Sequence, residues 1–192
     1  MALSTDTTAA HARALQQTGE IIAAIRADQL ELPTACSRYD VRALLNHLVG
    51  ATWVFAKVGA GEKVQRQDPP PDLVGDDPTA AYEQARQAVA AAFAQPGALD
   101  RTWSMPFADV PGAMAQNIHC VELTAHAWDL AKATGQLERL DPELGEVVLA
   151  LSRQIVSPGI RNDEGDPFAP EVPVDSGAPV YDRLAGFLGR RP

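Results

Sequence analysis

A chain of 192 residues is long enough for one domain with a full core, and its hydrophobic fraction of 46 % is ordinary for a globular protein. The net charge of −9 and the lack of any basic cluster argue against a nucleic-acid partner, and no apolar run is long enough for a membrane span. The N-terminus does not resemble a signal peptide, and two cysteines make no disulfide framework, so we expect a cytoplasmic protein.

Hydrophobic periodicity predicts a mostly helical chain. In chain order, the predicted helices cover residues 5–30, 37 to about 59, 79–94, 113–135, 142–156 and 180–188. Ser37 and Asp40 resemble a capping box at the start of the second of these helices. Alternation of Trp103, Met105 and Phe107 predicts one strand or a short hairpin arm before the fourth. We therefore expect an all-α fold: a four-helix bundle with a short β-strand or hairpin before its fourth helix and a small C-terminal helix.

Two stretches rich in proline, glycine and aspartate, residues 60–78 and 157–177, are predicted to be loops. The sequence contains no repeat and no change of composition between its halves. We therefore expect residues 1–192 to form a single domain, with 157–192 as a C-terminal extension packed on the bundle.

The predicted fourth helix, residues 113–135, carries an unusual polar stripe. At 3.6 residues per turn, His119, Glu122, His126 and Asp129 lie within roughly 80° of arc. Apolar residues flank the stripe on both sides, so it runs down the face that should enter the core. Ionisable groups in a core cost several kcal/mol unless they are paired or bind a metal, so this stripe needs a partner.

Glu122 and His126 have the i, i+4 spacing with which one helix presents two ligands to one ion. His47 lies on the apolar face of the second predicted helix and is the inward histidine that can complete the set. Two imidazoles and one carboxylate suit Zn²⁺ with a fourth position open, although Ni²⁺, Mn²⁺ or Fe²⁺ fit the same donors. We therefore predict a divalent-metal site at His47, Glu122 and His126.

Two further residues of the stripe, Asp129 and His119, are candidates for catalytic roles. Asp129 can accept the N–H of a ligand histidine and orient it, and His119 can act as a proton shuttle or an extra ligand. The alternative is a buried polar network without an ion, in which His126 pairs with Glu122 and His47 with Asp129.

The remaining histidine and the cysteines carry weaker expectations. His11 is expected on the surface, off the apolar stripe of the first helix. Cys120 is expected to serve packing. Cys36 precedes a helix N-terminus, a position that can lower the pKa of a thiol, but an inert residue is the simpler reading.

Three segments resemble a known family. CSRYDVRALLNHLVG (36–50) is similar to the histidine-bearing helix of the maleylpyruvate isomerase N-terminal family, part of the DinB-like metal-binding superfamily. VELTAHAWDLAKATG (121–135) resembles that family's E-x-x-x-H-x-W/F-D-L-A-x-A-x-G signature, and the ending YDRLAGFLGRRP resembles a short actinobacterial branch. The resemblance implies a DinB-like four-helix bundle with a divalent metal, and His47, Glu122 and His126 match the family's three ligands.

The resemblance also implies a function: isomerases and S-transferases of this superfamily use low-molecular-weight thiols, which in actinobacteria means mycothiol as co-substrate. Our first hypothesis is thus a metal-dependent thiol S-transferase or isomerase acting on a small electrophile, with the loops at 60–78 and 157–177 shaping the mouth of the site. The chain after Gly135 is too short for the large C-terminal domain of maleylpyruvate isomerase, which counts against that particular activity. The second hypothesis is a non-catalytic metal-binding or ligand-sensing protein linked to stress, with a homodimer as one arrangement. The third is a purely structural polar stripe.

Overall fold

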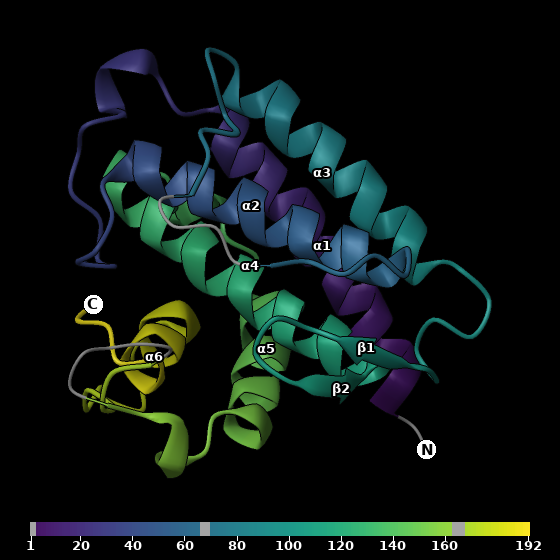
Figure 1. Cartoon of the computed structure of the whole chain (residues 1–192). Coiled ribbons are helices and arrows are strands. Elements are labelled where there is room, and N and C mark those ends of the chain that lie inside the picture. The colour runs from purple at the N-terminus through teal and green to yellow at the C-terminus, as the bar shows by residue number, and fades with distance from the viewer. Residues whose placement is uncertain (1–2, 66–69, 163–167) are drawn as a thin grey trace.

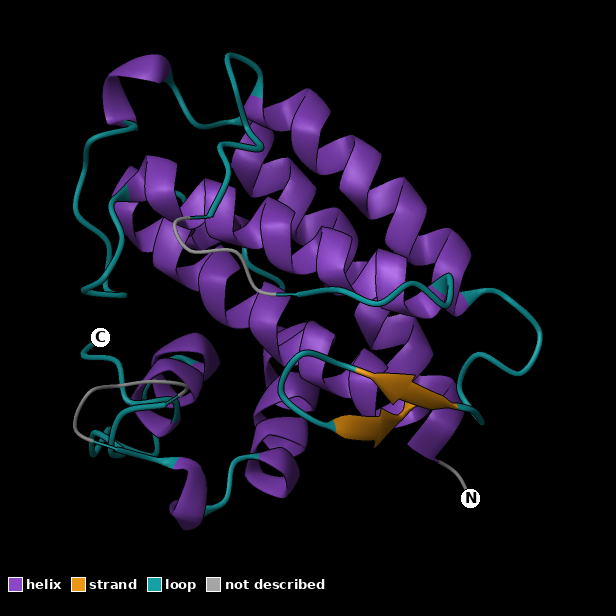
Figure 2. Cartoon of the chain, viewed as in Figure 1, coloured by secondary structure: helices purple, strands orange, loops and turns teal. Residues whose placement is uncertain are grey.

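The computed structural model describes residues 3–65, 70–162 and 168–192 of the chain, and the described residues are mostly helical (Figures 1 and 2). The α-helices are α1 (Leu3–Ala23), α2 (Val41–Gly59), α3 (Pro78–Phe93), α4 (Gly112–Thr134), α5 (Pro142–Ile155) and α6 (Val180–Phe187). The two strands are β1 (Thr102–Ser104) and β2 (Asp109–Pro111). Residues 66–69 and 163–167, which belong to the two predicted loops, lie outside the described residues. The predicted fold class, a helical bundle with a hairpin before its fourth helix and a small C-terminal helix, is confirmed.

Helix α4 is the central element of the bundle. It packs against α1, α2, α5 and α6, and α3 completes the bundle by packing on α1 and α2 (Figure 1). Because neighbours surround α4, nearly all of its residues from Ala115 to Ala131 are buried, including Cys120 and the polar residues His119, His126 and Asp129. The polar stripe therefore lies inside the protein, as its position among apolar residues predicted.

The first two helices have bounds that differ from the predicted ones. α1 ends at Ala23 rather than near residue 30, and a separate 3₁₀ turn (Ala27–Gln29) follows. The Arg26 amide at the start of this turn donates to the side chain of Gln29 (3.0 Å). The Gln29 side chain also donates to the Thr134 carbonyl at the end of α4 (3.1 Å). α2 begins at Val41, where Asp40 is the N-cap and accepts from the Ala43 amide (2.8 Å), so the predicted start at Ser37 was wrong.

Strands β1 and β2 form a two-stranded antiparallel hairpin at the end of the bundle where α4 begins (Figure 2). Trp103 pairs with Val110, and its buried indole donates to the Ala98 carbonyl (2.8 Å). Met105 is buried as the alternation predicted, but Phe107 lies in the turn between the strands and is 62 % exposed. The hairpin thus contributes Trp103 and Met105 to the core and leaves Phe107 in solvent.

The last residue of α2, Gly59, is predicted to tolerate no side chain. A Cβ there would lie 2.8 Å from the Ala92 Cβ and against the ring of Trp103. We expect Gly59→Ala to lower the free energy of unfolding by about 1–3 kcal/mol through overpacking. Gly50→Ala is the matched control in the same helix, because its Cβ would meet Leu73 at an ordinary 3.5 Å. Urea denaturation should find the control neutral or more stable, since alanine favours a helix interior. Equal effects at the two positions would contradict this explanation.

The C-terminal segment packs on the bundle through α6, which contacts α5 and α4. Gly145 permits this approach, because a Cβ on it would lie 2.7 Å from a Val180 methyl group. None of the helices in the described residues is both long and apolar enough to cross a membrane.

Candidate metal centre

The structure brings three donor side chains from two helices together. His47 Nε2 on α2 lies 2.6 Å from Glu122 Oε1 on α4, and His126 Nε2 lies 3.4 Å from the same oxygen. One ligand atom from each of the three residues lies within 4.8 Å of the others. The helix period places Glu122 and His126 one turn apart on α4, and the packing of α2 on α4 supplies His47.

The three donors approach the spacing that a metal ion requires. Bonds of about 2.0–2.2 Å in a tetrahedral zinc site separate neighbouring ligand atoms by about 3.3–3.5 Å. The distance of 3.4 Å between His126 and Glu122 has this value. The distance of 2.6 Å between His47 and Glu122 is that of a hydrogen bond and has to open by less than about 1 Å. The donor set and its spacing therefore fit a divalent cation after a small side-chain movement.

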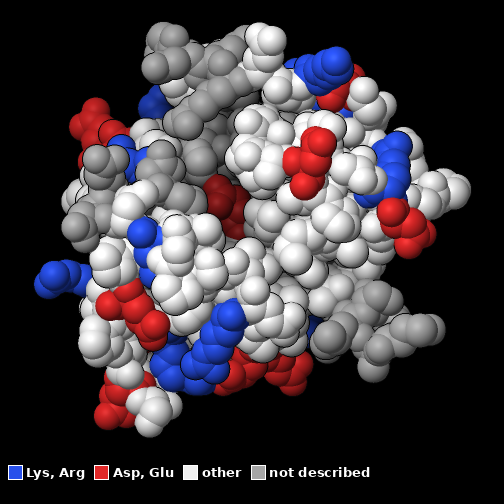
Figure 3. Space-filling view, turned by 60° about the horizontal axis from the view of Figure 1, so that its bottom comes forward, with Lys and Arg blue, Asp and Glu red and all other residues white. Residues whose placement is uncertain are grey.

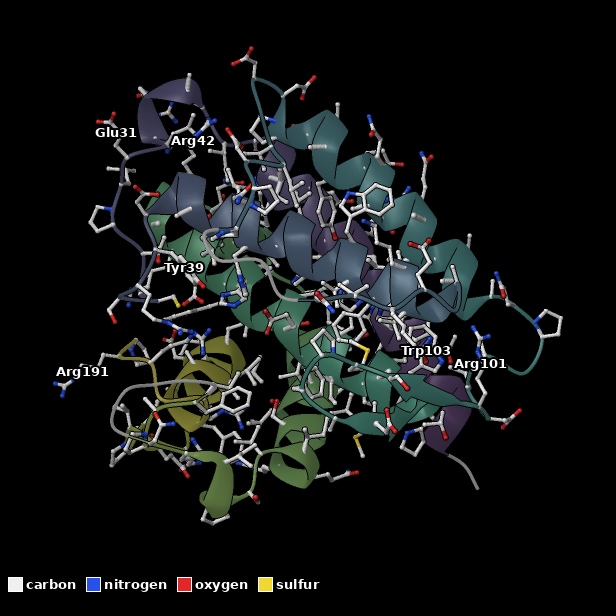
Figure 4. The ribbon with its side chains drawn as sticks, viewed as in Figure 1. Glu31, Tyr39, Arg42, Arg101, Trp103 and Arg191 are labelled. Carbon is white, nitrogen blue, oxygen red and sulfur yellow. The ribbon has the colours of Figure 1, made fainter. Side chains whose placement is uncertain are left out.

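His47 is held by aromatic contacts on two sides. Its ring stacks on Tyr39 (centroids 5.1 Å apart, 21° between planes) and meets the His126 ring edge to face at 5.0 Å. Tyr39 belongs to the segment that leads into α2 and is labelled in Figure 4. The tyrosine thus fixes the plane of the imidazole and forms a wall of the donor set.

Asp129 and Arg190 fix the orientation of His126. The His126 Nδ1 lies 2.9 Å from Asp129 Oδ2, so that with a proton on Nδ1 the Nε2 lone pair faces Glu122. Asp129 is fully buried, and the Nε of Arg190 lies 3.0 Å from both of its carboxylate oxygens. From the sequence, Asp129 was expected to accept from a ligand histidine or, in the network without an ion, to pair with His47; the structure pairs it with His126. The contact with Arg190, 61 residues away, was not predicted.

The charges in this cluster compensate one another. Burial alone would raise the pKa of Glu122, but the charges and hydrogen bonds of His126 and His47 hold it well below its usual range. Burial alone would lower the pKa of His126, but Glu122 and Asp129 raise it above its usual value. The carboxylate of Glu122 is therefore ionised at neutral pH and available as an anionic ligand.

The cluster is open on one side. The side chains of His47 and Glu122 are 31 % and 29 % exposed, against 7 % for His126. The face of the molecule in Figure 3 is hollowed, with acidic atoms at the bottom of the hollow. The exposed parts of His47 and Glu122 leave the donor set accessible from their side, whereas His126 and Asp129 are buried.

Residues 11–131 match the model of the mycothiol maleylpyruvate isomerase N-terminal domain. The chain belongs to this family. Two relatives from Mycobacterium tuberculosis, the uncharacterized proteins Rv0738 (strain H37Rv) and MT0763 (strain CDC 1551), are each 39 % identical over 183 residues, which cover 94 % of this chain and 96 % of theirs. No solved structure matches the chain significantly. The resemblance found in the sequence is confirmed, and the matched residues include all three candidate ligands and Asp129.

His119 lies on the same stripe but is not part of the donor set. Its Nε2 lies 3.3 Å from the Thr52 hydroxyl, which itself donates to the Leu48 carbonyl, so His119 Nε2–H is the donor in this contact. The Nδ1 of His119 then accepts from His11 Nε2–H at 2.9 Å. His11 is buried, so the expectation of a surface histidine was wrong: α1 packs on α4 and brings the two rings together. Both ring nitrogens of His119 have partners, which leaves none for an ion.

Because His11 and His119 are buried, we expect the stability of the protein to depend on pH. Burial lowers the pKa of His11 to about 4 and holds that of His119 well below its usual value. Between pH 6.5 and pH 4 these two histidines therefore bind more protons in the unfolded chain than in the folded one. The free energy of unfolding consequently falls as the pH drops toward 4, by up to about 3 kcal/mol for His11 alone. Urea denaturation at pH 7 and pH 5 should show a smaller loss in His11→Phe than in the unsubstituted protein. Parallel pH profiles for the two proteins would contradict this assignment.

Burial disfavours the thiolate form of both cysteines. Burial raises the pKa of Cys120 to about 12 and also raises that of Cys36. The helix-terminus effect considered for Cys36 is therefore absent, because Cys36 is part-buried and α2 begins only at Val41. Cys36 nevertheless lies near the site: its sulfur is within 4.8 Å of donor atoms of His126 and Asp129. This proximity was not predicted, because it depends on the path of the segment between α1 and α2.

Proposed function

We propose that this chain is a divalent-metal-dependent isomerase or S-transferase that uses a low-molecular-weight thiol such as mycothiol on a small electrophile, with zinc as the metal. Membership of the mycothiol maleylpyruvate isomerase N-terminal family supports the class of thiol chemistry. The observation that carries the proposal is the convergence of His47, Glu122 and His126 within 4.8 Å, open to solvent on one side.

The assigned ligands are His47, Glu122 and His126, and a bound zinc ion would lower the pKa of a thiol so that it becomes nucleophilic near neutral pH. Asp129 holds the proton on His126 Nδ1 and keeps Nε2 turned to the donor set. Tyr39 keeps the ring of His47 in place by stacking. The exposed edges of His47 and Glu122 leave room for the thiol and the electrophile.

The proposal is tested with zinc-loaded protein, a thiol and monochlorobimane. In this reaction a new S–C bond replaces the C–Cl bond, chloride leaves, and the proton of the thiol passes to the buffer. We expect conjugation above the rate without protein, its loss in a chelator, and its return on addition of zinc. The His126→Ala variant should be inactive in the same assay, whereas Arg191→Ala, which changes an exposed side chain, should be active.

The two other hypotheses predict different results. A metal-binding or ligand-sensing protein would hold about one equivalent of metal but show no metal-dependent conjugation with any of several thiols. A structural polar cluster would hold less than about a tenth of an equivalent after purification without chelator. Metal content is therefore the first measurement to make, because it separates the structural hypothesis from the others.

A further inference from the structure

His126 belongs to two donor sets, one at each edge of its ring. At the Nε2 edge lie Glu122 and His47, the proposed centre. At the Nδ1 edge lies Asp129 at 2.9 Å, and Cys36 completes a second group of three donors within 4.8 Å of one another. Thiolate, imidazole and carboxylate are ligands for zinc and cobalt, so the second set could also hold such an ion.

A guanidinium group already lies at the second set. The Nε of Arg190 is 3.0 Å from both oxygens of Asp129, and one terminal nitrogen is 3.5 Å from His126 Nδ1. The Arg190 side chain is 13 % exposed and Asp129 is fully buried, so this contact is shielded from water. The positive charge that a metal would supply there is thus provided by the protein itself.

The backbone at the end of α6 delivers Arg190 to this position. Gly189 has a φ of +85°, and a Cβ there would lie 2.8 Å from the Ala169 carbonyl oxygen, so a side chain is excluded on both counts. The Arg190 amide donates to the Ala185 carbonyl (2.9 Å), which closes the turn after the helix. The matched family region ends at residue 131, so this arginine is supplied by the C-terminal extension.

We propose that Arg190 is a positioning residue that occupies the cation position between Cys36, His126 and Asp129 and thereby directs a divalent metal to the Nε2 edge of His126. This inference rests on the proposed metal centre at His47, Glu122 and His126. With Arg190 present, Asp129 accepts from Nδ1–H, and the lone pair of Nε2 is free for a metal. Without it, a metal at Asp129 and Cys36 takes the Nδ1 lone pair, and the proton moves to Nε2. The two sets therefore compete for one tautomer of His126.

Cobalt(II) titration followed by absorption spectroscopy tests this inference, because only a cysteine ligand gives a thiolate-to-cobalt charge-transfer band in the near ultraviolet. We expect the unsubstituted protein to bind cobalt without this band. Arg190→Ala should bind cobalt with the band, and Arg190→Ala combined with Cys36→Ser should lose it. Arg190→Lys should give the spectrum of the unsubstituted protein, because the ammonium group still pairs with Asp129, and Arg191→Ala serves as the matched control. Arg191 follows Arg190 directly and its side chain points away from the molecule (Figure 4).

Each result bears on one proposal. A charge-transfer band in the unsubstituted protein, or a folded Arg190→Ala variant that lacks it, overturns the role of Arg190. Failure of the unsubstituted protein to bind cobalt overturns the proposed centre and, with it, the directing role of Arg190. A charge-transfer band in Arg190→Ala would then show only that Arg190 keeps a metal out of the second set.

If Arg190→Ala does not fold, alkylation of Cys36 in the unsubstituted protein tests the same inference. Cys36 is part-buried and Cys120 buried, so slow alkylation by iodoacetamide reports on Cys36. We expect saturating zinc to leave the alkylation rate of the unsubstituted protein unchanged, because Arg190 keeps the ion away from the thiol. Protection of Cys36 by zinc would show that the sulfur is a ligand and would overturn the inference.

Discussion

Replacing His126 by alanine should reduce bound zinc from about one equivalent per chain to less than about a tenth. His126 is the most buried of the three proposed ligands and the only one whose second ring nitrogen is held by a carboxylate. Its loss leaves His47 and Glu122, which are hydrogen-bonded to each other at 2.6 Å and offer an ion only two partly exposed donors. Metal analysis of protein purified without chelator measures the effect.

His119→Gln is the matched control for this variant. His119 lies on the same helix, is also buried, and bonds to His11 and Thr52 rather than to the donor set. We expect this variant to be less stable but to retain its metal. Equal loss of metal in both variants would mean that disruption of the core, and not removal of a ligand, explains the result for His126→Ala.

Asp129→Ala should have the largest effect on stability, lowering the unfolding free energy of the metal-free protein by about 3–5 kcal/mol. The substitution leaves the guanidinium of Arg190 and the Nδ1–H of His126 without their acceptor in a buried site. It should also weaken zinc binding by about 10–100-fold, because a carboxylate that orients a ligand histidine contributes this much. Urea denaturation in the presence of a chelator measures the first effect, and competition with a zinc indicator the second.

Asp28→Ala is the control for burial of the ion pair. Asp28 pairs with Arg26 at 3.0 Å, but its side chain is 70 % exposed, so its removal should leave the free energy of unfolding and the zinc affinity nearly unchanged. A cost for Asp129→Ala as small as that for Asp28→Ala would contradict the view that Arg190 and Asp129 form a buried pair on which the C-terminal extension depends.

Contacts within one helix were predictable, since a fixed period of 3.6 residues converts spacing into geometry. The spacing of Glu122, His126 and Asp129 predicted two donors one turn apart and a carboxylate at the next turn, and the structure places them so. His47 was proposed from its position on an apolar helix face and from the family resemblance. The apolar helix face by itself predicted only that His47 points inward, and not which residues it would meet.

His11 and His119 could not be placed correctly from helical periodicity alone. The periodicity of the first helix placed His11 off its apolar stripe, yet α1 packs so closely on α4 that His11 enters the core and bonds to His119. A prediction from the apolar periodicity of one helix does not include polar residues that pair across the interface between two helices. The same limit explains why His119 was a candidate for the site although its ring nitrogens serve Thr52 and His11.

By itself the sequence determined the helical character, the hairpin, the inward polar stripe of residues 119–129 and the family, because each of these follows from local periodicity or a local motif. Only the tertiary structure decided which residues from distant segments surround the donor set and Asp129: Tyr39 against His47, Cys36 near His126, and Arg190 on Asp129. The physical reason is that loops and helix packing angles set these contacts, and neither leaves a periodic signal in the chain. The electrostatic environment of His126 is therefore a property of the folded C-terminal extension as much as of its own helix.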